Sequence, residues 1–176
     1  MSPTGLITGT ATQPGPFQLT FDISQPNGPK STSMATLLVN NSQNICVFNG
    51  TTGATQQSFY AYSPEYRGGI NVAAGDVDGD GKADILTGAG PGGDPHVKVF
   101  SGADGSQKQS FDAFATGFNG GVSVASADLN QDGKADIIAG TQTQSAQVKA
   151  FSAIDLSVID DFFAFQGAVG VWVAGK

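Results

Sequence analysis

Two acidic loops with the same spacing constrain this chain more than any other feature of its sequence. In each loop, oxygen-bearing side chains occupy positions 1, 3, 5 and 9, and glycine occupies position 6. Ca²⁺ takes about six to eight oxygen ligands, and alternate residues of a tight loop can point inward together, with the carbonyl of position 7 as a further oxygen. The pattern predicts two calcium sites, with the ligands Asp76, Asp78, Asp80, Lys82 and Asp84 in the first loop and Asp128, Asn130, Asp132, Lys134 and Asp136 in the second.

These loops differ from an EF-hand in two respects. Thr87 and Ala139 occupy position 12, where an EF-hand carries a bidentate glutamate. The preceding residues alternate as strands do, at 70–73 and 122–125. We therefore expect each loop to join two strands of a β-hairpin. The alternative is that these Asp- and Gly-rich segments are plain turns, but two copies in register favour calcium.

The loops belong to a repeat of about fifty residues, because Asp76 and Asp128 lie 52 positions apart. Each unit contains four short strand-like stretches separated by Gly, Pro, Asn and Asp. Four strands in such a unit, repeated, describe the blade of a β-propeller. Aromatic pairs recur at one place in each unit, and we expect them to pack between neighbouring blades: Phe59/Tyr62, Phe111/Phe114 and Phe162/Phe165.

The repeat predicts an all-β fold, a β-propeller of four-stranded antiparallel blades that forms one domain over residues 1–176. The expected segments are a partial strand at 4–12, blades at 17–62, 69–114 and 121–165, and a partial strand at 169–175. The two partial strands would form part of a split fourth blade.

The acidic loop of the first blade is degenerate. Asp22, Ser24 and Asn27 remain of its ligand pattern, and Thr36 stands where the closing aspartate should be. We expect little or no calcium at this loop.

The loops and their surroundings resemble the FG-GAP/VCBS repeats of integrin-α-type β-propellers. The resemblance rests on the Asp-x-Asp-x-Asp-Gly-x-x-Asp loop at 76–84, its Asn variant at 128–136 and the Gly-rich segment at 88–93, and it is close over 69–165. It implies a Ca²⁺, usually structural, in each intact loop between the first two strands of a blade. It also implies a role in adhesion, surface assembly or carbohydrate recognition.

Three blades are too few to close a ring, since closed propellers usually need about four to eight. An open set of blades exposes unpaired strand edges, which are templates for pairing with another chain. We therefore expect either further blades from a longer protein, or a protein partner or second copy of this chain that completes the propeller as a homo-oligomer.

The amino-acid composition limits the classes of partner that this chain can bind. The net charge is −7, and the two intact loops supply seven of the fifteen acidic residues. Nucleic-acid binding rests on Lys and Arg that neutralise phosphates, and only eight scattered basic residues are present. No run of about 18 apolar residues exists, so we expect no membrane span. Cys46 stands alone in an apolar stretch and is expected to be a small buried hydrophobe.

The metal also suggests a compartment and a class of function. Loops that lack the position-12 glutamate are weak sites, which fill where Ca²⁺ is near millimolar, so we expect an extracellular or cell-surface protein. The leading function is a calcium-stabilised module for adhesion, surface assembly or protein interaction. The alternative is a lectin of the same fold that binds glycans.

We expect no enzymatic activity. The segment 88–93 fits G-x-G-x-x-G, but Pro95 and a strand follow it where a dinucleotide site needs a helix. His96 is the only histidine and is expected to be a rim or turn residue. No nucleophile-elbow pattern accompanies it.

Overall fold

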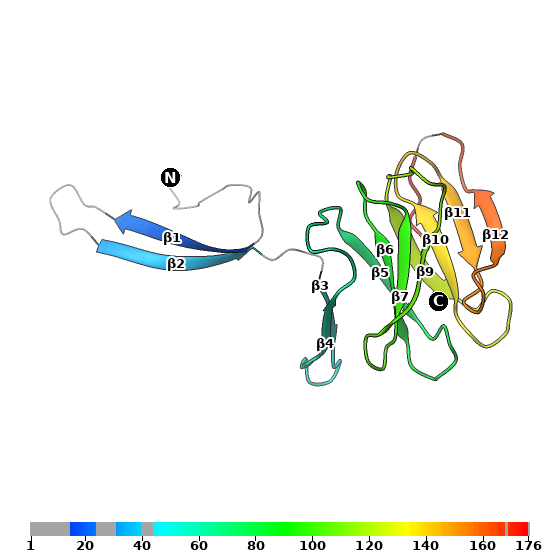
Figure 1. Ribbon diagram of the computed structural model, residues 1–176, viewed down its shortest axis with the longest axis horizontal. Coiled ribbons are helices and arrows are strands. Elements are labelled where there is room, and N and C mark those ends of the chain that lie inside the picture. The colour runs from blue at the N-terminus through cyan, green and yellow to red at the C-terminus, as the bar shows by residue number, and fades with distance from the viewer. Residues whose placement is uncertain (1–14, 24–30, 40–43, 168, 176) are drawn as a thin grey trace. The chain divides into compact units, whose positions relative to one another are not determined.

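The computed structural model describes residues 15–23, 31–39, 44–167 and 169–175 (Figure 1). These residues contain twelve β-strands and no helix, so the predicted all-β class is confirmed. The chain divides into two compact units, Met1–Asn41 and Ser42–Lys176. Each unit is described by itself below.

A complete four-stranded antiparallel sheet forms the middle of the second unit, drawn in green in Figure 1. Its strands pair in chain order: β5 (Ile70–Gly75), β6 (Asp84–Ala89), β7 (His96–Phe100) and β8 (Gln107–Asp112). Successive side chains of a strand point to opposite faces. In β7 this buries Val97 and Val99 and leaves His96 and Lys98 partly exposed. This sheet is the blade predicted over 69–114.

A second sheet of the same design follows, made of β9 (Val122–Ala127), β10 (Asp136–Thr141), β11 (Gln147–Phe151) and β12 (Val158–Phe163). Its register repeats that of the preceding blade, since Ile137 pairs with Phe151 as Ile85 pairs with Phe100. Both outer hairpins have a register shift at the same place, a β-bulge. Four-stranded antiparallel blades are therefore confirmed, here over the segment predicted at 121–165.

The core lies between these two blades, where β9 packs against β5 and β6. The ring of Phe111 on β8 lies 5.0 Å from the ring of Phe151 on β11, centroid to centroid. An aromatic position predicted to pack between blades does so here, whereas Phe162 and Phe165 of the third blade are exposed. Removal of apolar surface from water is the main stabilising term in such a core. The fully buried side chains at its centre are Leu86, Val97, Val99, Val122 and Ile137.

The outer half of a further blade precedes them. β3 (Asn44–Phe48) and β4 (Thr55–Tyr60) form a hairpin with the same bulge, between Val47 and Phe48. The ring of Phe59 lies 4.7 Å from the ring of Phe100, which repeats the aromatic contact between the two complete blades. Cys46 on β3 is exposed, so its predicted burial is wrong. Within the described residues β3 has no hydrogen-bonded neighbour other than β4, and so nothing in its sheet covers this side chain.

The first unit contains one long hairpin, β1 (Gly15–Ile23) with β2 (Ser31–Val39), paired from Gly15↔Val39 to Ile23↔Ser31. These strands occupy the segment predicted as the inner half of blade one. The continuous four-stranded sheet expected over 17–62, and the single domain over 1–176, remain predictions. In the described residues, β1–β2 and β3–β4 are separate two-stranded sheets, and they belong to different units.

The closing aspartate ties the acidic loop to the outer hairpin in both complete blades. In both complete blades the closing aspartate of the acidic loop accepts a backbone hydrogen bond from the turn of the outer hairpin, as Asp84 does from Gly102. Thr36 stands at this position in the first blade. The remnants Ser24 and Asn27 and the partial strand expected at 4–12 lie outside the described residues.

Residues 169–175 run along the third blade without forming a regular strand. The Val171 amide donates to the Thr141 carbonyl over 2.7 Å, and the Ser123 hydroxyl donates to the Val171 carbonyl over 2.9 Å. The same relation joins the two complete blades, where the Asn71 amide group donates to the Val122 carbonyl over 2.7 Å. This segment therefore lies where the first strand of a following blade would lie.

Candidate metal centre

The first acidic loop joins β5 to β6, as predicted, and curls around its first carboxylate. Asp76 accepts hydrogen bonds from the backbone amides of Gly79, Asp80 and Gly81, at 2.7, 3.1 and 2.8 Å. Gly79 and Gly81 have φ angles of 79° and 81°, in the left-handed region that glycine enters without steric cost. The glycines thus allow the turn that brings several backbone amides to one side chain.

The closing residue of the loop, Asp84, is fully buried. One carboxylate oxygen accepts from the Val77 amide at 3.2 Å, and the other accepts from the Gly102 amide at 3.0 Å. Asp84 therefore connects the acidic loop to the turn between β7 and β8. A buried carboxylate is costly unless it is hydrogen-bonded and its charge is matched, so this position favours a nearby cation.

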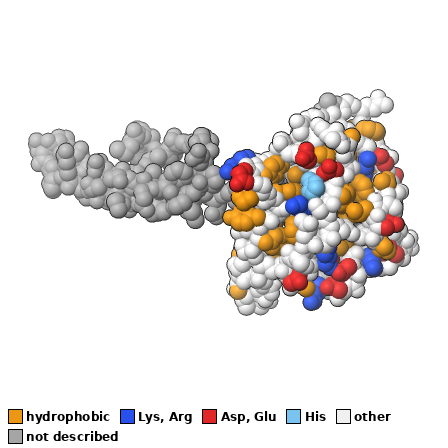
Figure 2. All heavy atoms as spheres, in the orientation of Figure 1, with side chains coloured by type: hydrophobic (Ala, Val, Ile, Leu, Met, Phe, Trp, Pro, Cys, Tyr) orange, Lys and Arg blue, Asp and Glu red, His pale blue; other side chains and the backbone are white. Residues whose placement is uncertain are grey.

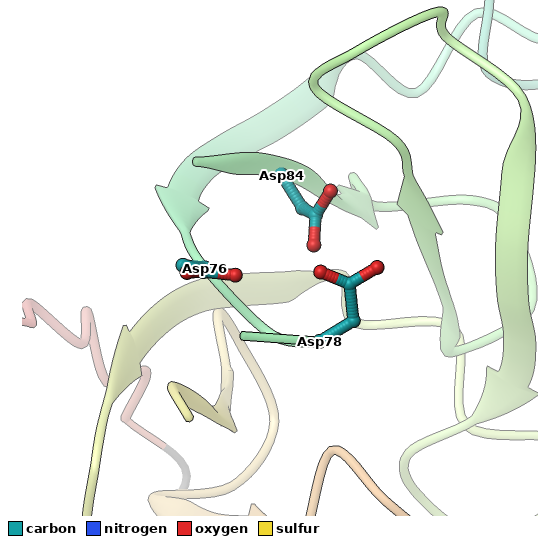
Figure 3. A group of neighbouring side chains, drawn as sticks. All are labelled: Asp76, Asp78 and Asp84. Atoms are coloured by element: carbon teal, nitrogen blue, oxygen red, sulfur yellow. The ribbon is translucent and has the colours of Figure 1, made fainter. Parts of the chain in front are cut away.

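Three carboxylates of this loop face a common space (Figure 3). Asp76, Asp78 and Asp84 each offer one oxygen atom, and these atoms lie within 4.8 Å of one another. The ammonium group of Lys108 is ion-paired with Asp78 and lies 3.1 Å from Asp84 Oδ1. A positive charge thus already stands among these oxygens, and the donor set fits a hard cation such as Ca²⁺.

The Lys108 contact changes the proton affinities of both partners. Its hydrogen bond lowers the pKa of Asp78 below the ordinary value for an aspartate. The same bond, helped by Asp84, raises the pKa of Lys108. Both groups are therefore charged near neutral pH. Asp80 uses its carboxylate to accept from the Lys82 amide at 2.8 Å and is not one of the three converging groups. Its ligand role, and that of the Lys82 carbonyl, remain predictions.

The second loop, between β9 and β10, repeats this conformation. Asp128 accepts from the amides of Asp132 and Gly133 at 3.2 and 3.0 Å. Asn130 Oδ1 also accepts from Asp132, at 3.0 Å, and Asp132 accepts from Lys134 at 2.9 Å. The sequence therefore predicted correctly that these residues share one loop, although their binding of calcium remains a prediction.

Asp136 closes the second loop as Asp84 closes the first. It is fully buried, and it accepts from the backbone amides of Leu129 at 2.9 Å and Ala153 at 3.4 Å. Gln131 stands where the first loop has Gly79, and it adopts a φ of 62°. The loop geometry thus persists with a side chain at this strained position.

Sequence reasoning missed Lys108 as a member of the first site. The acidic motif could not reveal it, because Lys108 lies 24 residues beyond Asp84, on the edge strand of the blade. No sequence motif marks it, because Lys108 is the extra residue at the bulge of the outer hairpin, which only the strand register shows.

The structure also brings together a histidine, a serine and an aspartate. His96 Nδ1 lies 2.7 Å from Asp112 Oδ1, and His96 Nε2 lies 2.7 Å from Ser110 Oγ. The three side chains stand on the paired regular strands β7 and β8, where His96 lies directly opposite Asp112. A nucleophilic serine is usually held on a strained turn beside oxyanion-binding amides. We therefore interpret this group as a cross-strand hydrogen-bonded cluster that His96 joins at the start of its strand.

These observations define a protein built from β-propeller blades, each with an acidic loop between its first and second strands. The family model of the FG-GAP repeat matches residues 68–106 and 120–150, which include both loops. Both segments therefore carry FG-GAP repeats, as their sequence motifs suggested. Comparisons with curated proteins and with solved structures found no match.

Proposed function

We propose that this chain is a β-propeller module for adhesion or protein interaction, a function that its FG-GAP repeats and four-stranded blades support. In this proposal the module is stabilised by two Ca²⁺ ions, acts outside the cell or at the cell surface, and binds a protein partner through the ends of its blade stack. FG-GAP repeats are in general interaction modules rather than enzymes, and we include the absence of catalysis in the proposal.

The observation that carries the calcium proposal is the convergence of Asp76, Asp78 and Asp84 around a positive charge. The second loop has the same backbone hydrogen bonds and the same buried closing residue, Asp136. Bound Ca²⁺ would balance the negative charge that remains in each loop. Because the ion would bind the folded loop and not the unfolded chain, it would stabilise the fold by about 2.7 kcal/mol per site at a hundred times Kd.

Isothermal titration calorimetry with Ca²⁺ tests this proposal. The wild-type chain should bind two ions. Asp78→Ala should remove only the first site, and Asn130→Ala, at the matching position, should remove only the second. An absence of calcium-dependent heat and of any calcium-induced rise in Tm in the wild type would contradict the proposal. Two sites that persist in both variants would show that the ions bind elsewhere.

The extracellular location is inferred from the weakness of the sites. Neither loop has the position-12 glutamate, and sites of low affinity fill where Ca²⁺ is near millimolar. Within the described residues, no helix is long and apolar enough to cross a membrane. Secretion of the natural protein, followed in its source cells by fractionation and surface labelling, tests the location.

A protein partner fits the charge of the surface better than a nucleic acid does. On the face drawn in Figure 2, Lys and Arg side chains are interspersed with Asp and Glu. Nucleic-acid binding would require basic groups gathered along a phosphate backbone. We therefore propose that the partner is protein.

A hollow of about 290 Å³ favours glycan binding as a second candidate function. Its lining includes the aromatic rings of Tyr62 and Tyr66 together with Asp94, His96 and Lys98. A ring face beside charged groups suits a sugar, which has apolar and hydroxyl surfaces. A glycan array should show binding that Tyr66→Ala removes if this candidate is right. An array without hits would eliminate it.

A further inference from the structure

We propose that Lys108 is a built-in competitor for the cation at the first loop, and that it sets the affinity of that loop for Ca²⁺. The inference rests on the proposed calcium function and concerns a residue outside the acidic motif. It predicts that removal of Lys108 changes the calcium affinity of the first loop but not that of the second, although the two loops are alike in sequence.

The contacts of Lys108 place its ammonium group inside the ligand set. It pairs with Asp78 and lies 3.1 and 3.4 Å from the two oxygens of Asp84. Two of the three converging carboxylates therefore hold the same lysine. A Ca²⁺ ion that uses these oxygens must first displace it. The Lys108 side chain keeps 22% of its surface exposed, so a path to solvent is open.

The third blade offers a natural comparison, because the bulge identifies the equivalent residue. Lys108 lies between Gln107, paired with Phe100, and Gln109, paired with Val99. Ile159 lies in the same way between the partners of Phe151 and Ala150. Where the first loop faces a lysine, the second therefore has an isoleucine at the matching bulge.

The two loops differ in charge as well as in the residue at the bulge. The first loop carries four aspartates and the second carries three, because Asn130 replaces the carboxylate of Asp78. With the Lys108 ammonium added, both sites have the same formal charge. Affinity of such sites rises with ligand charge. Lys108 thus offsets the additional carboxylate of the first loop, and in the absence of calcium it relieves the repulsion between Asp78 and Asp84.

Each loop can be measured alone by silencing the other. In an Asn130→Ala background, Lys108→Met should tighten Ca²⁺ binding at the first loop roughly tenfold, the order expected for one nearby unit charge in a partly exposed site. In an Asp78→Ala background, Ile159→Lys should weaken the second loop by a similar factor. Lys98→Met is the matched control, because it removes the same charge from a lysine that lies over the Tyr62 ring.

A second readout does not depend on a binding isotherm. In EDTA, Lys108→Met should lower Tm, because the two carboxylates lose their cation, and Ca²⁺ should raise Tm more than in the wild type. In the matched control, Ca²⁺ should raise Tm by as much as it does in the wild type.

The outcomes separate the inference from the proposed function. If both loops bind Ca²⁺ and Lys108→Met changes affinity no more than Lys98→Met does, the role of Lys108 is refuted while the calcium sites stand. If neither wild-type loop binds, the proposed function fails and takes this inference with it. Should Lys108→Met not fold, the Ile159→Lys arm decides: unchanged affinity at the second loop overturns the inference.

Discussion

At the scale of single residues, the closing aspartate of each loop is a structural residue as well as a candidate ligand. Asp84 and Asp136 are fully buried and hold the loop to the turn of the outer hairpin through backbone amides. Asp132, by contrast, is exposed and bonds only within its own loop. The same residue type therefore serves two purposes in one motif, and the two can be separated by experiment.

Substitution of the closing aspartate should destabilise the fold even without calcium. Asp136→Ala leaves the amides of Leu129 and Ala153 without their acceptor, and an unsatisfied buried group costs about 1–3 kcal/mol. Asp132→Ala should have a much smaller effect under the same conditions. Urea unfolding in EDTA measures both. If both variants lose the same free energy of unfolding, the buried hydrogen bonds of Asp136 add nothing to the effect of removing one negative charge.

Two carboxylates in the turns of the outer hairpins should stabilise the fold at neutral pH and lose this effect at acidic pH. Hydrogen bonds from Ser106 lower the pKa of Asp104, and bonds from Ser157 lower that of Asp155. A carboxylate with a lowered folded-state pKa stabilises the fold above its unfolded pKa, and this stabilisation is lost as pH falls through the folded value. Asp104→Asn should therefore be less stable than the wild type at pH 7, and the difference in Tm should shrink as pH falls below the ordinary aspartate pKa of about 3.9. A Tm difference that is constant with pH would contradict this.

At the scale of elements, the contact between blades depends on a glycine. A Cβ atom added at Gly88 on β6 would overlap the backbone carbonyl of Val122 on the next blade. At Gly140, the matching position on β10, the nearest atoms are the Ser123 hydroxyl at 2.8 Å and a Val173 methyl group at 3.0 Å, which can move. Gly88→Ala should therefore destabilise by about 1–3 kcal/mol, and Gly140→Ala by less. Chemical denaturation compares the two, and an equal cost would mean that the blades can separate without penalty.

The sequence predicted the two complete blades because their signals are local and repeated. Acidic loop, apolar alternation and turn residues recur at fixed spacing, and each strand pairs with its neighbour in the chain. The four-stranded sheet of the first blade stays a prediction, because a strand pattern cannot show whether β2 pairs with β3. The sequence has Thr36 where both complete blades have their closing aspartate.

The candidate site was predictable to the same extent as the loops. The spacing of the aspartates gave the residues that share one loop. It could not show that Asp84 is buried, that Asp80 is not among the converging carboxylates, or that Lys108 enters from an edge strand, because these follow from packing between hairpins.

At the scale of the whole molecule, the second unit, taken by itself, has two different ends that carry matching aromatic residues. In each internal contact, a phenylalanine of a fourth strand packs on a phenylalanine of the next blade's third strand, as Phe59 does on Phe100 and Phe111 on Phe151. Those third-strand residues are 5% and 6% exposed. At the ends, Phe162 is 46% exposed and Phe48 is 57% exposed.

The two ends are therefore complementary, and Phe162 of one molecule could pack on Phe48 of the next. Such a head-to-tail contact is heterologous, and it gives a ring if the rotation between copies closes and a filament if it does not. The alternative partners are further blades of a longer protein or a different protein. A second copy is the partner that we propose, and substitution at the two ends distinguishes it.

Phe162→Asp and Phe48→Asp should each stop self-association, because burial of one such side chain contributes about 1.5–3 kcal/mol and a charge reverses it. Light scattering behind a sizing column in millimolar Ca²⁺ measures the mass. Phe163→Asp is the control, since Phe163 directly follows Phe162 and its side chain points to the opposite face of the strand. The decisive sample is a mixture of the two blocked variants. Each retains one intact end, so the head-to-tail contact predicts a capped dimer in the mixture and monomers in each variant alone. A wild type that stays monomeric throughout would exclude the second copy, and the exposed ends would then belong to blades of another chain segment or protein.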